Sequence, residues 1–197
     1  MAESFIYNVP NALSSNDCKS LIDCIESNIE YSDIEHVVKP DGSLLKLMRS
    51  LNSNPGHEYS DIFEPFNNKI KSILAHHFRI YFNTYMDNGM KHGIEPIDTI
   101  DQIKYQKFSP PGHFDWHFEQ GAREDSKGRF LVWMIYLNTI ENTGSTDFYY
   151  QKESYQPIEG SLLMWPASFT HMHRGNSNLD TEKYIATGWF NFDKLYS

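Results

Sequence analysis

The hydrophobic period changes near Pro96, and this change limits the folds open to the 197-residue chain. Before it, apolar residues recur at helical spacing and predict helices over residues 15–28 and from about Pro65 to Met86. After it come short apolar runs separated by clusters of Gly, Asn and Pro. Several short strands with turn signals between them are typical of an antiparallel sandwich or barrel.

Six segments after Pro96 have strand character, and we expect them to build most of the β-structure. They are IDQIKYQKF, FDWHFE, RFLVWMIYLN, TDFYYQ, GSLLMWP and KYIATGWFNF. The polar stretch 31–59 adds two short candidates around Val37 and Leu45. Because no linker or repeat interrupts the chain, we predict one domain over residues 1–197, with helical support and loops over 1–95 and the β-core over 96–197.

Composition excludes some classes of function. The net charge is −9, which argues against a nucleic-acid partner, because such proteins need a basic face. The N-terminus MAESFIYNVP is not a secretory signal, and no apolar stretch reaches membrane-spanning length. The two cysteines, Cys18 and Cys24, lie on different faces of the first predicted helix, so a disulfide is not expected. We therefore expect a cytoplasmic protein without a membrane partner.

One short stretch alternates metal-capable and aromatic side chains. In PPGHFDWHFEQ the metal-capable residues stand at every second position: His113, Asp115, His117 and Glu119. On a strand they share one face, and the other face, expected in the core, holds Phe114, Trp116 and Phe118. At roughly 3.3 Å per residue the four positions span about 20 Å. A single ion can therefore bind one adjacent His-x-carboxylate pair.

A second histidine cluster and a lysine complete the pattern. HMHRG, with His171 and His173, follows the apolar run LLMWP. Two histidines and one carboxylate with open positions form the facial triad of non-haem Fe(II) oxygenases. Lys183 stands among apolar residues of the predicted strand KYIATGWF. A buried lysine is costly unless an anion meets it, so an anionic ligand is expected there.

The C-terminal half, residues 103–192, resembles the Fe(II)- and 2-oxoglutarate-dependent dioxygenases, in particular their prolyl 4-hydroxylase-like branch. The resemblance rests on ordered motifs: a Gly-led turn before His-x-Glu, then Tyr-Leu and Gly-x-Thr-x-Phe in MIYLNTIENTGSTDF, then the Gly-led strand GSLLMWP. His173-Arg174-Gly175 follows, with Lys183 ten positions after the histidine and Trp189 shortly beyond. Each motif is weak alone, but their order and spacing together are specific.

The resemblance implies a fold and a set of ligands. The fold is mainly β with N-terminal helices, around a double-stranded β-helix (jelly-roll, cupin-like) core. His117, Glu119 and His173 fall on the Fe(II) positions, although the commoner family carboxylate is aspartate. Phe108 stands where relatives often carry a tyrosine that contacts 2-oxoglutarate. The residues expected around 2-oxoglutarate are Lys183, Thr146, Trp189, and Tyr105 or Tyr136.

The implied activity is hydroxylation of a peptidyl proline or an amino acid, so the partner is a peptide or a small molecule. Fe(II), 2-oxoglutarate and O₂ are required, ascorbate serves as a reductant, and succinate and CO₂ are released. His113 with Asp115 is the rival metal pair, and His171 is the rival distal ligand. The residues expected in the outer shell or near the substrate are His113, Asp115, His171, Arg174 and Arg49.

Two other classes of function remain open from the residues. A zinc-type metallohydrolase would use His113, Asp115 and His117, but it gives Lys183 no role. A non-catalytic jelly-roll binding module would make the histidines incidental and would not bind 2-oxoglutarate. Nucleic-acid demethylation, a third possibility within the resembled family, conflicts with the acidic charge.

Overall fold

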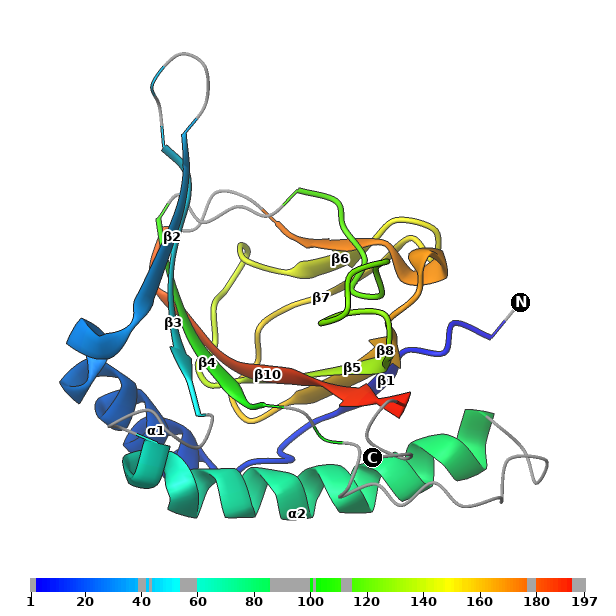
Figure 1. Ribbon diagram of the computed structural model, residues 1–197, viewed down its shortest axis with the longest axis horizontal. Coiled ribbons are helices and arrows are strands. Elements are labelled where there is room, and N and C mark those ends of the chain that lie inside the picture. Colours follow the sequence, from blue (N-terminus) through cyan, green and yellow to red (C-terminus); the bar gives the residue numbers. More distant parts are fainter. Residues whose placement is uncertain are drawn as a thin grey trace.

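The computed structural model describes residues 3–38, 42, 44–53, 60–85, 100, 102–110, 115–176 and 180–192. Two antiparallel sheets face each other, with helices outside the larger one (Figure 1). The larger sheet has seven strands in the order β1 (Tyr7–Val9), β8 (Leu162–Pro166), β5 (Arg129–Tyr136), β10 (Lys183–Asn191), β4 (Lys104–Ser109), β3 (Leu44–Asn52) and β2 (Asp33–Val38). The smaller sheet has the order β7 (Glu153–Tyr155), β6 (Thr146–Phe148) and β9 (His173–Gly175). The predicted fold class, a double-stranded β-helix with N-terminal helices, is confirmed.

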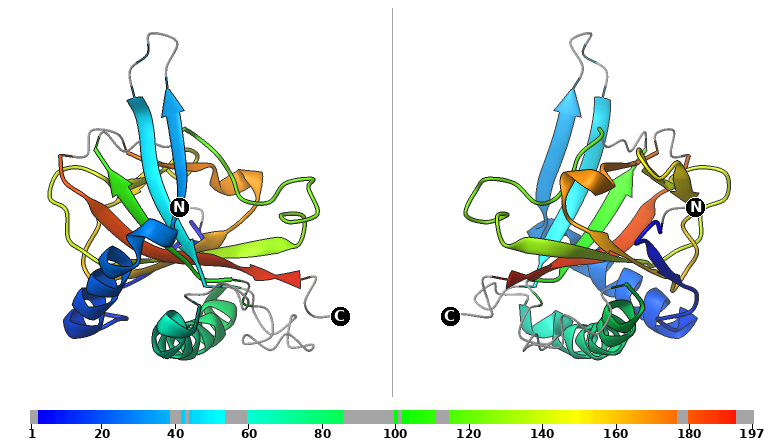
Figure 2. Two further views of the ribbon diagram at one scale, coloured as in Figure 1. Left: turned by 60° about the vertical axis from the view of Figure 1, so that its left-hand side comes forward. Right: turned by 90° about the vertical axis from the view of Figure 1, so that its right-hand side faces the viewer.

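Two α-helices lie side by side against the outer face of the larger sheet (Figure 2). Helix α1 spans Ser15–Ser27, and the hydroxyl of Ser14 caps it by accepting from the Asp17 backbone N–H at 3.2 Å. Helix α2 spans Ser60–Tyr85 and begins earlier than predicted. Pro65 is the sixth residue of this helix, where it removes one intrahelical hydrogen bond without ending the helix, so it does not mark the boundary. No helix in the described ranges is both long and apolar enough to cross a membrane.

Two 3₁₀ helices and one hairpin connect or extend these elements. A 3₁₀ helix, η1 (Ile29–Tyr31), connects α1 to β2, and another, η4 (Phe169–His171), connects β8 to β9. The strands around Val37 and Leu45 are longer than predicted and form a hairpin that extends past the other strands (Figure 1). With β1 on the opposite edge, residues before 95 contribute three strands to the larger sheet, one more than the two short candidates expected there.

The alternation of strand residues produces two separate cores. The outer core packs the larger sheet on the helices and includes Phe63, Phe78, Tyr105, Trp133 and Phe190. The inner core lies between the sheets and includes Phe108, Val132, Phe148, Trp165 and Ile185. Successive side chains of a strand point to opposite faces, so each central strand serves both cores. The candidate site opens from the inner core.

Candidate metal centre

The segment that carries His117 is pinned to β9 at a single point. His117 and His173 exchange two backbone hydrogen bonds of 2.9 Å each, which form an isolated antiparallel bridge. Two residues later, the N–H groups of Glu119 and Gln120 donate to the Ala167 carbonyl at 3.0 and 2.9 Å. The strand predicted from FDWHFE is therefore wrong in its described part, because bonds to two different partners replace a continuous ladder.

The prediction that the aromatic face of this segment enters the core is also wrong for the described residues. Phe118 is 45% exposed, and Trp116 packs edge-to-face on Tyr149 with ring centroids 5.2 Å apart. The segment borders the smaller sheet at its edge, so its outward face meets other surface side chains rather than a packed layer. The inward face, in contrast, holds the polar groups as expected.

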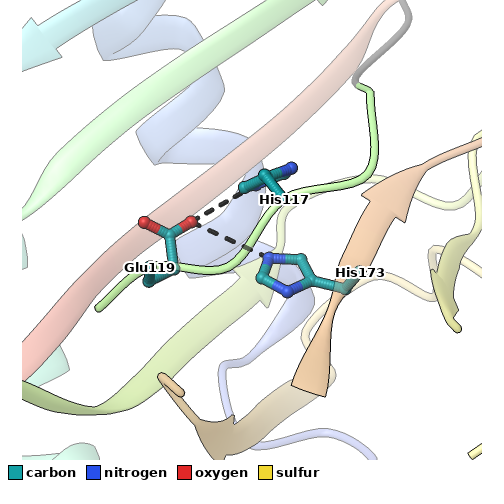
Figure 3. A group of neighbouring side chains, drawn as sticks. All are labelled: His117, Glu119 and His173. Atoms are coloured by element: carbon teal, nitrogen blue, oxygen red, sulfur yellow. Dashed lines mark ion pairs between the residues drawn. The ribbon is translucent and has the colours of Figure 1, made fainter. Parts of the chain in front are cut away.

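Two of these side chains, His117 and Glu119, converge on one point with His173 of β9 (Figure 3). Glu119 Oε1 lies 3.4 Å from His117 Nε2 and 3.7 Å from His173 Nε2. One ligand atom from each residue falls within 4.8 Å of the others, and no second group of this kind occurs in the described ranges. One ion can bind all three atoms. Two imidazole nitrogens and one carboxylate oxygen are the donor set of the Fe(II) facial triad, so the residues present fit that ion.

The tautomers of both histidines are fixed by backbone carbonyls. His117 Nδ1 lies 2.8 Å from the Asp115 carbonyl oxygen, and His173 Nδ1 lies 2.9 Å from the His171 carbonyl oxygen. A ring nitrogen facing a carbonyl oxygen must carry the hydrogen, which leaves the Nε2 lone pair for a metal. The ring of His173 is held further by Trp165, with centroids 5.0 Å apart. The two imidazoles are therefore oriented without a metal.

The carboxylate of Glu119 stays ionised in this setting. Burial by itself raises the pKa of Glu119, but when His117 and His173 are protonated their hydrogen bonds and charge outweigh it and hold the pKa below its usual range. Its second oxygen, Oε2, accepts a hydrogen bond from Arg129 Nη1 at 3.2 Å. An ionised carboxylate is the form that binds a metal, so the group needs no deprotonation at neutral pH.

A cavity of about 450 Å³ opens beside the three groups. Its wall includes Lys183, Thr146, Trp189 and Phe108 in addition to the metal-capable side chains. Lys183 is fully buried, and its Nζ donates to the Gly144 carbonyl at 2.6 Å. Burial lowers the pKa of Lys183 to about 7, against the weaker opposing effect of Asp147. An anion entering the cavity would restore the charge of this amine.

The two tyrosines expected near 2-oxoglutarate lie on opposite sides of the larger sheet. The Tyr136 hydroxyl donates to Thr146 Oγ1 at 2.7 Å, and Lys183 Nζ lies 5.1 Å from the centroid of its ring. Tyr105 instead stacks on Phe63 of α2 with centroids 4.6 Å apart. Of these two candidates, Tyr136 lies in the inner core against Thr146 and Lys183 of the cavity wall, and Tyr105 lies in the outer core.

The residues expected in the outer shell are mostly directed elsewhere. His113 lies outside the described residues. Asp115 meets His117 through its backbone carbonyl, and its carboxylate is not part of the cluster. His171 has both ring nitrogens engaged, Nε2 with the Ser4 carbonyl at 2.9 Å and Nδ1 with Thr170. Burial lowers the pKa of His171, and the residue is not part of the cluster.

The two arginines among the predicted residues also have other partners. Arg174 Nε lies 3.5 Å from Asp147 Oδ2, and its guanidinium covers Trp116 at 4.5 Å from the ring centroid. Arg49 Nη1 donates to Ser32 Oγ at 3.4 Å. The β3 neighbours of Arg49, Met48 and Ser50, line the cavity, so Arg49 points to the opposite face of the sheet.

Arg129 is a site residue that the sequence reasoning missed. It opens β5, pairs with Glu119, and covers Trp189 with its guanidinium carbon 3.6 Å from the ring centroid. The signal in the sequence was an arginine at the start of the apolar run FLVWMIY. A charge beside such a run is buried only when it is paired.

Comparison with known proteins identifies the domain. The family described as the 2OG-Fe(II) oxygenase superfamily matches residues 103–191. The chain carries a 2OG-Fe(II) oxygenase domain over these residues. It is a 2-oxoglutarate-dependent dioxygenase, whose cofactors are Fe(II), 2-oxoglutarate and O₂. The match begins just before β4 and ends with β10, so it covers strands β4 to β10 but not β1, β2 and β3 of the larger sheet.

Solved structures share the fold over nearly the whole chain. A viral collagen prolyl hydroxylase from Paramecium Bursaria Chlorella virus-1, in complex with 2OG, has a TM-score of 0.64 and 19% identity, and the match covers 95% of each chain. A prolyl-4-hydroxylase from Pseudomonas putida has a TM-score of 0.61 and 16% identity, with 95% and 92% covered. A prolyl hydroxylase from Trichoplax adhaerens, in complex with a hypoxia inducible factor peptide fragment, has a TM-score of 0.68 and 13% identity, with 97% and 85% covered. No curated protein matches the sequence.

Proposed function

We propose that this dioxygenase binds Fe(II) through His117, Glu119 and His173 and binds the distal carboxylate of 2-oxoglutarate through Lys183. The observation that carries the proposal is the convergence of two fixed Nε2 lone pairs and one carboxylate oxygen beside a cavity that also contains a buried amine. The metal ligands and the amine would account for the two ends of 2-oxoglutarate.

The chemistry that Fe(II) and 2-oxoglutarate supply determines which roles remain for the residues of the cavity. Fe(II) with 2-oxoglutarate and O₂ inserts one oxygen atom into a substrate C–H bond, and the other oxygen leaves in succinate, with release of CO₂. Lys183 holds the co-substrate, and Tyr136 orients the Thr146 hydroxyl beside it. Trp189 and Phe108 close the cavity wall and exclude water. Ascorbate is added as a reductant in the assay described below.

We propose a peptidyl proline as the substrate. Support comes from relatives whose names describe prolyl hydroxylases, one of them holding a peptide fragment. Support also comes from the cavity, which continues along the inner face of the larger sheet past hydrogen-bonding side chains: Gln106, Lys104, Ser50 and Asn52. Side-chain donors and acceptors in successive rows suit the amide groups of an extended peptide.

The same cavity is less suited to the zinc hydrolase alternative. His117 directs Nε2 to Glu119 and His173, and the Asp115 carboxylate is not in that cluster. The cavity also gives the buried Lys183 a role, which neither the hydrolase nor the non-catalytic module does. The oxygenase assignment therefore uses more of the site.

A succinate-release assay tests this function. The protein is supplied with Fe(II), ascorbate and 2-oxoglutarate and then with a panel of proline-containing peptides and free amino acids. We expect a peptide with a proline to raise succinate release above the uncoupled background, with a mass gain of one oxygen on the peptide. If only free amino acids stimulate release, the peptide proposal fails while the oxygenase assignment stands.

We further propose that residues 1–197 act as one cytosolic unit. The N-terminal strands β1 and β3 pair with β8 and β4 of the matched region, and β2 pairs with β3, which supports a single domain. Cys18 and Cys24 are free thiols, which is consistent with a reducing compartment. The charge of −9 argues against a nucleic-acid partner or an anionic membrane surface.

A further inference from the structure

The two carboxylate oxygens of Glu119 have different partners. Oε1 faces the Nε2 atoms of His117 and His173 at 3.4 and 3.7 Å. Oε2 faces away from them and accepts a hydrogen bond from Arg129 Nη1 at 3.2 Å. The same nitrogen lies 3.4 Å from the backbone carbonyl oxygen of Glu119. Arg129 therefore holds both the side chain and the backbone of this residue.

Arg129 is itself held in place. Its side chain is 13% exposed, and its guanidinium carbon lies 3.6 Å from the centroid of the Trp189 ring. A guanidinium flat on an indole gains a cation–π contact and keeps its plane fixed. The backbone supports this placement, since Arg129 of β5 pairs with Asn191 of β10 where the register shifts after Phe190.

Glu119 needs such a restraint more than a shorter carboxylate would. A glutamate side chain has three rotatable bonds, and ordering it costs more entropy than ordering a residue with fewer. A free carboxylate can also turn both oxygens toward one ion, as calcium-binding glutamates do. With Oε2 bonded to Arg129, one oxygen remains directed at the histidine pair. The other metal positions stay open for 2-oxoglutarate and O₂.

We propose that Arg129, held flat on Trp189, is a positioning residue that fixes Glu119 as a one-oxygen metal ligand. This inference rests on the proposed function, because it assigns Arg129 a role toward the Fe(II) of that same site. Arg129 acts through Glu119 and does not itself bind the metal.

A role for the charge of Arg129 alone and a role in positioning Glu119 predict opposite changes in metal affinity when Arg129 is replaced. A nearby cation weakens the attraction of a carboxylate for a divalent ion, so loss of the charge alone would tighten metal binding. Loss of the restraint would weaken binding, because hydrogen-bond partners of metal ligands are typically worth about ten- to a hundredfold in metal affinity. The sign of the change therefore separates the two explanations.

The test is a titration of the metal-free protein with Co²⁺, followed by visible absorption, without 2-oxoglutarate. We expect Arg129→Gln to weaken Co²⁺ binding about ten- to a hundredfold. Arg129→Lys keeps the charge but not the planar fork, so its loss should be smaller than that of Arg129→Gln. Arg174→Gln is the matched control. Arg174 is next to His173, and it also pairs with a carboxylate and covers a tryptophan. Its carboxylate partner, Asp147, is outside the metal cluster.

Two further variants, Glu119→Asp and its combination with Arg129→Gln, keep the test decisive if a single variant fails to fold. Glu119→Asp withdraws the carboxylate from Arg129 by one methylene group and should weaken Co²⁺ binding on its own. If the two residues act as a unit, adding Arg129→Gln to Glu119→Asp weakens binding by less than about threefold further. Thermal unfolding of each metal-free variant shows whether it is folded. If Arg129→Gln is unfolded, Arg129→Lys and its combination with Glu119→Asp decide the question in the same way.

Either of two results overturns the proposal: Arg129→Gln binds Co²⁺ as tightly as wild type or more tightly, or the two substitutions are additive. The proposed function fails in a different way, namely if the wild type neither binds Co²⁺ through histidine ligands nor releases succinate. A wild type that does both, with an Arg129→Gln variant of unchanged affinity, refutes the role of Arg129 alone.

Discussion

The two faces of the larger sheet are built by the same strands and differ in chemistry. Along β10, the residues toward the helices are Tyr184, Ala186, Gly188 and Phe190, and the residues toward the cavity are Lys183, Ile185, Thr187 and Trp189. The helix face is almost wholly apolar and fully covered. The cavity face places a lysine, a hydroxyl group and an indole in one row, and only its deeper part is packed.

The difference shows that the helix face stabilises the fold and that the cavity face destabilises it when no ligand is bound. Buried apolar area on the helix face stabilises the fold at about 25 cal/mol per Å². On the cavity face, Lys183 is fully buried with its pKa lowered to about 7, which is a cost to the protein without its ligand. Substitutions on the two faces should therefore change different observables.

The largest effect should follow Lys183→Ala, which removes the amine but leaves the metal cluster intact. Breaking one partner of a buried ion pair costs about 3–5 kcal/mol, or roughly two to three and a half decades in the half-saturating 2-oxoglutarate concentration. The affinity for Co²⁺ should stay near the wild-type value. A shift of less than about threefold would mean that another group, with Arg174 the first to examine, anchors the carboxylate.

Phe78→Ala, on the helix face, should change the free energy of unfolding by a similar amount. Phe78 is 2% exposed and packs on Phe190 with centroids 4.6 Å apart. Loss of a buried phenylalanine costs about 3–5 kcal/mol, which lowers the thermal midpoint by roughly 6 to 20 °C. The half-saturating 2-oxoglutarate concentration of the folded variant should not change. A large change in that concentration would show that the two faces are coupled.

The pH dependence of 2-oxoglutarate binding should report the buried amine. In the free protein Lys183 has a pKa of about 7, and pairing with a carboxylate raises it. Below pH 7 the amine is already charged, so affinity is constant; above pH 7 a proton must be taken up, so the dissociation constant rises about tenfold per pH unit. Calorimetric titrations over about two pH units above neutrality measure this slope. A flat profile in the wild type would contradict it, and Lys183→Arg should be flat because arginine stays charged.

The smallest effect is expected from removing one tyrosine hydroxyl group on each face of the larger sheet. Tyr136→Phe removes the donor to Thr146 on the cavity face, worth about 1 kcal/mol, and should raise the half-saturating 2-oxoglutarate concentration by about two- to fivefold. Tyr184→Phe removes hydroxyl contacts with Glu26 and Glu182 on the helix face. It should lower stability by a similar amount without changing the 2-oxoglutarate requirement. Equal effects of both variants on that requirement would remove Tyr136 from the site.

The fold was predictable where the sequence pattern is long enough to have a period. Helix α1 was predicted to within a residue, and β5, β8 and β10 lie in three of the six apolar runs. The three-residue strands β1, β7 and β9 were missed because three residues carry no measurable alternation, whereas β6 was found inside the longer run TDFYYQ. The extended stretch from 115 to 119 was taken for a strand because its alternation is perfect, yet its hydrogen bonds go to two separate partners.

The candidate site was predictable from motif spacing but not from contacts across strands. The family resemblance, which rests on motif order and spacing, grouped His117, Glu119, His173 and Lys183, and all four line one cavity. It left Tyr105 and Tyr136 open, since the choice depends on which face of the sheet each occupies. Arg129 was not found, because its role depends on Trp189 and Glu119, which are distant from it in sequence or carried by another element.

The central claim is that the iron site is the inward cluster of His117, Glu119 and His173 rather than the pair His113 and Asp115. Uncoupled succinate release with Fe(II) and 2-oxoglutarate, measured in His113→Ala and His117→Ala, tests it most directly. The account predicts that His113→Ala keeps most of the wild-type rate and that His117→Ala loses more than about hundredfold, since loss of a ligand exceeds loss of its hydrogen-bond partner. A His117→Ala protein that still releases succinate, beside an inactive His113→Ala, would contradict it.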